Sequence, residues 1–359
     1  MGEKTIPGSA AWILWNTFGF PVELSCVMAE DDGYTVDMEG FAVARAADIE
    51  ASKSRGSVAG GVSLELIAKH TSAAAEANVP HTDQKPKWEW HKPVSATVVG
   101  LFAADELLLE SGASVAASAD AVGVILDVTA FYATMGGQVT DLGTITKGEG
   151  DEEGSSAFDV TEAKVFGGYV LHQGIVTDGS LAVGDSVTCQ VDYAYRSLIA
   201  PNHTMTHVCS LALRTHYSAD VAQKGSLCDS SKIRFDFAGR AGLDRTQIEN
   251  VQAMCQAQIA AALPVHCKEV PFETAKTIKG LRYMAEAHYP ENVRVVSIGP
   301  TIDELLADPS SDKGIEFSVE LCGGTHMTNI SKAVQVSFDI LLFYLPLTFG
   351  ANPAANNVI

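Results

Sequence analysis

Two short segments that lie far apart in the chain together carry four residues of the kind that bind zinc. In the segment PNHTMTH, His203 and His207 are four residues apart, a spacing that places both imidazoles on one face of a helix. In the segment CGGTH, Cys322 and His326 have the same spacing. Three histidines and one cysteine match the ligands of a tetrahedral zinc site. The sequence therefore predicts one zinc ion, and a fold that joins segments more than a hundred residues apart.

The quartet allows two interpretations. Either pair alone would be a weak signal, because paired histidines on one helix face are common. A closed site with four protein ligands would only hold the fold together, whereas a catalytic site needs one open position for water or substrate. The residues alone favour the structural interpretation, and they leave open which ligand would give way in a catalytic site.

The composition indicates a folded chain in a reducing compartment. Of the 359 residues, 47% are hydrophobic and 19% are charged, as in folded proteins. The seven cysteines have no framework spacing, which favours free thiols and a cytoplasmic location. We expect no signal peptide, because no basic region followed by an apolar region occurs at the N-terminus. We expect no membrane partner, since the apolar run at 340–345 is too short to span a bilayer. The net charge of −20 is unfavourable for RNA contact, which would need a local basic path or help from a missing partner domain, and no DNA partner is expected.

Residues 1–94 read as mainly helical. Apolar positions recur at helical spacing in four stretches: residues 10–18, 21–30, 39–55 and 64–77. A loop is expected at 80–93, where Trp88 and Trp90 occur. Packing is the commoner fate of such tryptophans, and stacking on nucleic-acid bases is the alternative.

Residues 95–195 change to short alternating strands separated by glycines, a pattern typical of a small β-barrel. Five strands are expected: residues 97–102, 121–128, 143–146, 163–172 and 186–191. Between them, the loop Gly136-Gly137-Gln138 allows the backbone to come close to another strand or to a ligand, and the residues alone favour the strand.

Residues 196–340 mix helices and strands, which predicts a two-layer α/β domain. A helix is expected at His203–Tyr217 with Asn202 as its cap, and the strand that ends at residue 321 would deliver Cys322. Further elements are expected as helices at 244–262 and 272–287 and strands at 232–237, 268–271, 293–298 and 316–321. With a divergent tail at 341–359, the predicted fold class is α+β and multidomain: a helical segment, a small barrel and a zinc-binding α/β domain.

The sequence segments around the zinc motifs resemble the editing domain, also called the second additional domain, of alanyl-tRNA synthetase. They are NHTMTH, ALR, QKGSL, RFDF, VRVVSIG and ELCGGTH. Upstream, FYATMGGQVTDLG and GGYVLHQG are similar to the barrel-like segment before that domain, and PGSAAWILWNTFGFPVEL is similar to the end of the tRNA-recognition region. The resemblance extends over residues 4–340 and is closest to the eukaryotic cytosolic form.

This resemblance implies a catalytic zinc site that hydrolyses Ser-tRNA(Ala) or Gly-tRNA(Ala), with the acceptor end of alanine tRNA as partner. A pocket sized for alanine rejects serine poorly, and a second site that binds the serine hydroxyl corrects the error. Glycine would need a route that depends less on a hydroxyl. The alternatives are an inactive fragment with structural zinc and a non-catalytic tRNA-binding module.

The resemblance also implies roles for residues outside the metal quartet. Thr206 and Gln223 would read the serine hydroxyl, and Gly323 and Gly324 would offer backbone amides to the ester oxygen. Their ordinary structural roles would be a helix hydroxyl bonded to its own backbone, a turn glutamine and a tight turn. Three cations are candidates for contact with RNA phosphates: Arg214, Lys224 and Arg234. For any one of them, solvated or paired surface charge is the commoner role.

Two departures from the resembled family limit what we expect of the chain. An ATP-binding antiparallel sheet with arginine motifs would lie before residue 1, so ATP is expected only for that aminoacylation domain, and alanine activation is not expected from this chain alone. At the other end, the resemblance fades within 333–340 and the next apolar strand is missing, which would leave a sheet edge unpaired. A general zinc hydrolase is disfavoured because HxxxH lacks the glutamate of HExxH.

Overall fold

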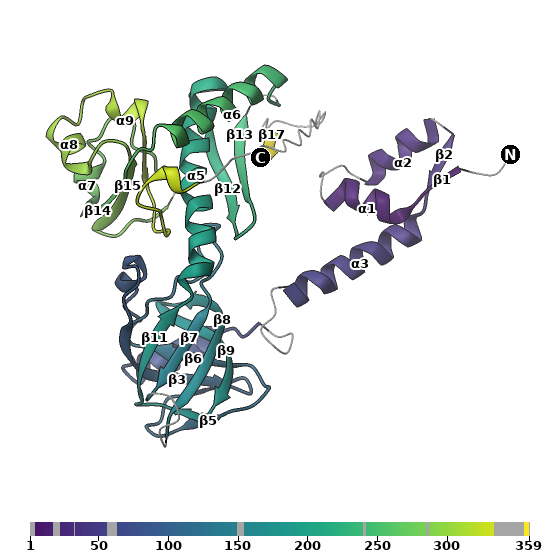
Figure 1. Cartoon of the computed structure of the whole chain (residues 1–359). Helices are drawn as coiled ribbons and strands as arrows, with labels where there is room; N and C mark the ends of the chain where they lie inside the picture. The colour runs from purple at the N-terminus through teal and green to yellow at the C-terminus, as the bar shows by residue number, and fades with distance from the viewer. Residues whose placement is uncertain are drawn as a thin grey trace.

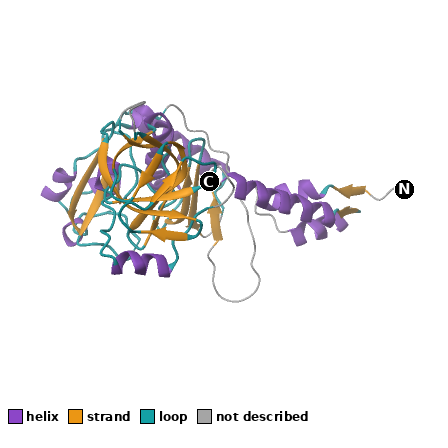
Figure 2. Cartoon of the chain, turned by 90° about the horizontal axis from the view of Figure 1, so that it is seen from below, coloured by secondary structure: helices purple, strands orange, loops and turns teal. Residues whose placement is uncertain are grey.

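A computed structural model of the chain describes residues 4–16, 22–31, 33–55, 63–148, 154–239, 242–284, 287–333 and 355–358. Along the chain, helices come first, then a barrel, then a mixed α/β part (Figure 1). In Figure 2 the strands of the main body are gathered together, with helices at their periphery. Within the described ranges, no helix combines the length and the apolar character that crossing a membrane requires.

The N-terminal part is helical, as predicted, and has a small core of its own around Trp12 and Phe41, whose rings meet edge to face. Its helices are α1 (Gly8–Asn16), α2 (Val22–Asp31), α3 (Met38–Arg55) and α4 (Ala68–Glu76), followed by the 3₁₀-helix η1 (Lys85–Trp88). It also contains the parallel pair β1 (Lys4–Ile6) and β2 (Tyr34–Val36). These strands were not predicted, because three residues are too few to show a period of two. Helix α4 packs on the barrel through Ala74.

The barrel forms because antiparallel strands with buried apolar faces close into a ring. Its strands are β3 (Val94–Ala103), β6 (Val122–Leu126), β7 (Gly143–Lys147), β8 (Ser156–Phe166), β9 (Tyr169–Asp178) and β11 (Ser186–Val191). They are ordered β11-β7-β8-β9-β6-β3, and β3 pairs back with β11, which closes the ring and confirms the predicted barrel. The single strand predicted at 163–172 is wrong, because the chain turns at Gly167 and Gly168, with φ +56° and +93°, between the end of β8 and the start of β9. Three short strands lie beside the barrel. Strand β4 (Glu106–Leu108) pairs antiparallel with β3, and β5 (Ser114–Ala116) pairs with β10 (Ser180–Ala182).

The α/β part begins with α5 (Tyr193–His216), which runs from the barrel into this part (Figure 1). One sheet is β12 (Ala222–Cys228), β13 (Ile233–Gly239) and β17 (Ala355–Val358), and the other is β14 (Val265–Pro271), β15 (Asn292–Ile298) and β16 (Ser318–Leu321). The remaining elements are α6 (Arg245–Ala260), α7 (Phe272–Ala275), α8 (Ile302–Ala307), α9 (Lys313–Glu316) and η2 (Ile330–Lys332). Helices α5 and α6 share a core with η2 and the β12–β13 sheet.

Two predictions for this part need correction. The helix predicted at 272–287 is wrong beyond its first turn, since α7 ends at Ala275. Gly280, at φ +87°, approaches the backbone of Gly314 so closely that a Cβ would lie 2.3 Å from the Gly314 oxygen, and this contact turns the chain. The tail expected at 341–359 provides strand β17, which pairs with β13, while residues 341–354 and 359 lie outside the described residues.

Candidate metal centre

The first two ligands lie on α5. Asp192 caps this helix, because its carboxylate accepts a hydrogen bond from the Tyr195 amide at 3.0 Å. Asn202, which was predicted as the cap, lies inside the helix and donates from Nδ2 to the Asp229 carbonyl at 2.7 Å. The predicted start was wrong because Pro201 is tolerated inside this helix, although proline usually marks a helix end.

The other two ligands follow β16, in the turn formed by the CGG sequence. Gly324 lies so close to His203 that a Cβ on it would be 2.1 Å from the imidazole Cε1, so the ring position requires glycine here. Its amide donates towards Cys322 Sγ at 3.4 Å. A Cβ on Gly323 would meet only Met135 Cε at 3.7 Å, an ordinary contact. Of the two glycines, Gly324 therefore shapes the ligand turn.

The structure brings the four predicted ligands together. One donor atom from each of His203, His207, Cys322 and His326 lies within 4.8 Å of the other three. Cys322 Sγ is 3.3 Å from the Nε2 atoms of His203 and His326. A tetrahedral site with Zn–S near 2.3 Å and Zn–N near 2.0 Å has a sulfur–nitrogen edge of about 3.5 Å. His207 Nδ1 is buried without a hydrogen-bond partner in the described part of the chain. The donor set thus fits a metal ion with the preferences of zinc.

Two of the imidazoles are held with Nε2 free for a metal. Gln138 Oε1 lies 2.6 Å from His203 Nδ1 and accepts from the Thr325 amide at 3.0 Å. Because a backbone amide only donates, this oxygen is an acceptor, and His203 Nδ1 carries the proton. Thr204 Oγ1 donates to a carbonyl of its own helix at 2.9 Å, so it accepts from His326 Nδ1 at 3.1 Å. Such outer partners fix the tautomer and orientation of metal-bound histidines.

Gln138 is the site residue that sequence reasoning missed. Its side chain is fully buried, and its Nε2 also donates to Thr325 Oγ1 at 2.8 Å. The preceding glycines, Gly136 and Gly137, adopt φ +60° and +85°, and a Cβ on Gly137 would lie 2.3 Å from the Ser226 oxygen of β12. The loop therefore approaches a strand with its backbone, as the residues favoured, and reaches the metal cluster with its side chain.

Burial and mutual charge control the protonation of the ligands. Burial lowers the pKa of His203 to about 4 and lowers the pKa of His326 well below its usual value. Both imidazoles are neutral at pH 7, as metal ligands must be. Burial also acts to lower the pKa of His207, but the negative charges of Glu320 and Cys322 outweigh it and raise that pKa. Burial acts to raise the pKa of Cys322, yet the positive charge of His207 outweighs it and lowers that pKa below the usual value of a thiol, which increases the thiolate fraction.

The residues predicted to read a hydroxyl lie on α5 and β12. Thr206 is buried next to the ligands, and its hydroxyl donates to the His203 carbonyl at 2.7 Å, which leaves the oxygen able to accept. Gln223 is on strand β12 rather than in a turn, is exposed, and donates to Ser226 Oγ at 3.1 Å. Their roles in substrate recognition stay predictions.

The three cations predicted to contact RNA lie in different surroundings. Arg214 is half-buried, and its Nη2 has no hydrogen-bond partner among the described residues. Lys224 is exposed on β12. Arg234 forms an ion pair with Asp236 at 3.2 Å, so part of its charge is already used. Contact with RNA phosphates stays a prediction for all three.

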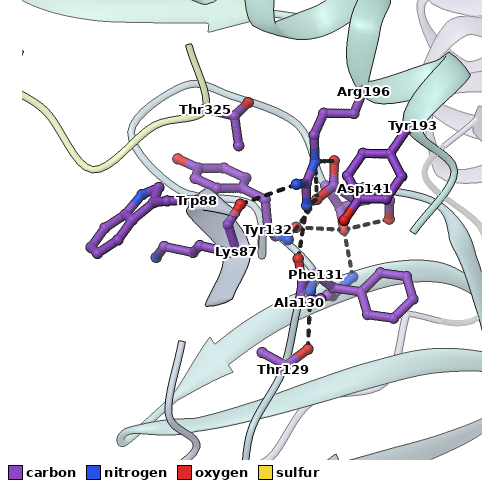
Figure 3. Close-up of polar contacts among 12 residues, drawn as sticks. Lys87, Trp88, Thr129, Ala130, Phe131, Tyr132, Asp141, Tyr193, Arg196 and Thr325 are labelled. Atoms are coloured by element: carbon purple, nitrogen blue, oxygen red, sulfur yellow. Dashed lines mark hydrogen bonds and ion pairs between the residues drawn. The ribbon is translucent and has the colours of Figure 1, made fainter. Parts of the chain in front are cut away.

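A buried ion pair fastens the ligand helix to the barrel (Figure 3). Arg196 on α5 and Asp141 are both fully buried and paired. The guanidinium also donates from Nη1 to the Lys87 carbonyl at 3.0 Å and from Nη2 to the Ala130 carbonyl at 2.8 Å. Asp141 accepts in turn from the Tyr132 amide at 2.7 Å. This network fixes α5 against the barrel, and so keeps the helical ligands in register with the barrel loop that contacts them.

Comparison with known proteins finds two matching families. A family described as tRNA synthetases class II (A) matches residues 1–195, which include the helical segment and the barrel. A family described as the Threonyl and Alanyl tRNA synthetase second additional domain matches residues 293–336. The second match contains two of the four ligands, Cys322 and His326.

The chain is similar to alanine–tRNA ligases over most of its length. It is 36% identical over 344 residues to the mitochondrial protein of Saccharomyces cerevisiae, which covers 95% of the chain and 33% of that protein. It is 38% identical over 327 residues to the protein of Candida albicans, covering 90% and 33%, respectively. It is 36% identical over 342 residues to the cytoplasmic protein of Bombyx mori, covering 92% and 34%. The chain thus spans about a third of the length of these curated relatives.

Proposed function

The chain belongs to the class II (A) tRNA synthetase family, and on that premise we propose that its metal centre hydrolyses Ser-tRNA(Ala) and Gly-tRNA(Ala). The observation that carries the proposal is the convergence of His203, His207, Cys322 and His326 in a chain similar to alanine–tRNA ligases. Two of these ligands lie in the part that matches the second additional domain. The acceptor end of alanine tRNA is the proposed partner.

The ligands differ in how accessible they are. Cys322 is half-buried, whereas the three histidines are buried. A catalytic site needs an open coordination position, so we place the substrate on the side of Cys322. Zinc bound by these residues would supply Lewis acidity to the ester carbonyl or to an attacking water. Gln138 keeps the Nε2 atom of its histidine partner turned towards the cluster.

Discrimination between serine and alanine is assigned to two polar side chains, one beside the cluster and one on β12. Thr206 retains acceptor capacity for a substrate hydroxyl, and Gln223 offers an amide. When an ester binds, these side chains lose their contact with water. A seryl ester replaces that contact with its hydroxyl, whereas an alanyl ester leaves the side chains unpaired, which disfavours its hydrolysis. The Gly323 amide is the proposed donor to the ester oxygen, since the Gly324 amide already faces Cys322 Sγ. The glycyl ester also lacks the hydroxyl, so this discrimination applies to serine against alanine only. Hydrolysis of the glycyl ester needs a route that does not depend on a hydroxyl, through the metal and this amide.

A second function, non-catalytic tRNA binding with structural zinc, is favoured by one observation. All four donors are supplied by the protein, which is typical of a closed structural site. Alanine activation is not proposed for this chain, which spans about a third of its curated relatives, although the family that matches residues 1–195 is a synthetase family. The cytoplasmic location stays a prediction, since relatives' names include both "mitochondrial" and "cytoplasmic".

The proposal is tested by single-turnover deacylation of seryl-, glycyl- and alanyl-tRNA(Ala). Zinc-loaded protein is compared with Cys322→Ala, and circular dichroism checks that both are folded. We expect the zinc-loaded protein to release serine and glycine, but not alanine, from the tRNA, and we expect the Cys322→Ala variant to release none of them. No hydrolysis by a folded, zinc-bound chain would refute the enzyme, and RNA binding without hydrolysis would favour the binding module.

A further inference from the structure

An indole and a guanidinium bond to the backbone of the turn that carries Cys322, and a lysine lies beside the indole. Trp88 belongs to η1, before the barrel, yet its Nε1 donates to the Gly323 carbonyl at 3.0 Å. Arg294 on β15 donates from Nη1 to the carbonyls of Cys322 at 3.0 Å and Gly324 at 2.9 Å. Residues from two distant parts of the chain therefore meet at the backbone of the metal-ligand turn.

The indole of Trp88 lies close to two cations, Arg294 and Lys87. The guanidinium carbon of Arg294 lies 4.9 Å from the centre of the Trp88 ring, and Lys87 Nζ lies 5.2 Å from it. Cations at such distances are attracted by the ring electrons. In Figure 3 the Lys87 carbonyl faces Arg196, whereas the ammonium points the opposite way, beside Trp88. The lysine ammonium therefore lies beside the indole whose Nε1 bonds to the metal-ligand turn.

Among the residues that the structure describes, these two positive charges have no acidic partner. None of the described carboxylates forms an ion pair with Lys87 or Arg294, although the chain has a net charge of −20. Lys87 is only 5% exposed, and its Nζ donates to the Gln84 side-chain oxygen at 3.3 Å. Burial and the charge of Arg294 lower the pKa of Lys87 to about 8, so the ammonium is still mostly charged at pH 7. The charge of the Cys322 sulfur acts in the opposite direction and raises that pKa, but less strongly. A buried ammonium beside a half-buried guanidinium is unfavourable without a counter-ion, and an anion that joins them would relieve this cost.

We propose that Lys87 and Arg294, held by Trp88, bind a backbone phosphate of the single-stranded 3′ end of the RNA. This subsite rests on the proposed function, because it would place the terminal nucleotide beside Cys322. Arginine and lysine are the residues that bind phosphate oxygens, and an indole that holds them limits their motion. The subsite also gives an acidic chain the local basic path that RNA contact requires.

The test uses the zinc-loaded full chain and two RNA minihelices, one with the single-stranded 3′ end and one without it. Binding is measured by fluorescence anisotropy from 50 to 200 mM salt. In Lys87→Met, affinity for the complete minihelix should fall about tenfold and the salt slope should decrease by about 1, with no change for the shortened RNA. Lys85→Gln is the matched control, since Lys85 is exposed on the same short helix, and it should bind as the parent does.

Arg294→Gln is the second variant and should reproduce the loss if Lys87→Met does not fold. Zinc content and melting temperature are measured for every variant. Inorganic phosphate should compete with the complete minihelix in the parent and much less in Lys87→Met. An unchanged affinity and salt slope in both variants, or equal losses for both minihelices, would overturn the subsite. RNA binding that depends on Lys87 in a chain without hydrolysis would refute the proposed function and keep the subsite.

Discussion

Replacing Gln138 by alanine should weaken zinc binding without touching any ligand. The change removes three contacts: His203 Nδ1 at 2.6 Å, the Thr325 amide at 3.0 Å and Thr325 Oγ1 at 2.8 Å. Loss of such an outer partner typically weakens metal binding about 10- to 100-fold, or about 1.4 to 2.7 kcal/mol. The two orphaned donors would in addition reduce the free energy of unfolding by about 1–3 kcal/mol each.

The affinity is measured by competition with a chromophoric zinc chelator, and stability by urea denaturation. Gln138→Glu keeps an oxygen for both donors, so it should retain most of the affinity, since a carboxylate partner is common for zinc-bound histidine. Gln173→Ala is the matched control: Gln173 is equally buried, but its amide bonds to the backbone of Leu64 at 2.7 and 3.0 Å. This control should lose stability and keep zinc affinity.

The reasoning about Gln138 would be refuted by either of two results. One is a Gln138→Ala protein that binds zinc as tightly as the parent. The other is an equal loss of zinc affinity in Gln173→Ala, which would show that general destabilisation of the barrel, rather than the contact with His203, controls the metal.

Three further changes test the turn, the barrel and the junction. Gly324→Ala should abolish stoichiometric zinc binding, because its Cβ would lie 2.1 Å from an imidazole carbon, whereas Gly323→Ala should bind one zinc. Burial lowers the pKa of His172 to about 4, below the unfolded value of about 6.5. The unfolded chain therefore binds more protons, and the free energy of unfolding should fall by about 1.4 kcal/mol per pH unit from pH 6.5 towards 4. Asp141→Ala leaves buried Arg196 unpaired and should cost about 3–5 kcal/mol in urea denaturation.

Each of these has a clear contrary result. Full zinc content in Gly324→Ala, measured by atomic absorption, would show that the turn can move away from the imidazole. A His172→Gln protein with the same pH dependence of stability as the parent would show that His172 does not titrate as described. An Asp141→Ala protein as stable as the parent would mean that Arg196 finds solvent or another partner.

The metal quartet was predictable because its signal is local. Two ligands on one helix face and two at the end of a strand are each fixed by a spacing of four, and only their meeting depends on the fold. The barrel was predictable for a similar reason, since alternation of apolar residues depends on neighbours in sequence. Both kinds of pattern can be recognised from a single sequence.

The features that were missed depend on contacts between distant residues. An amide such as Gln138 has no spacing rule, and only the fold places it beside His203. The start of α5 depends on Asp192, while Pro201 suggested a later start. The helix expected at 272–287 ends at Ala275, and further along the chain Gly280 meets the backbone of Gly314, a contact that local propensity does not contain.

The most direct measurement is the ratio of seryl- to alanyl-tRNA(Ala) hydrolysis by one preparation of the protein, before and after removal of its metal. We expect the zinc-loaded chain to hydrolyse the seryl ester faster by about a hundredfold or more, with the activity lost on chelation and restored by zinc. Equal rates for the two esters, or a seryl rate that does not change when the metal is removed, would contradict an editing centre built on His203, His207, Cys322 and His326.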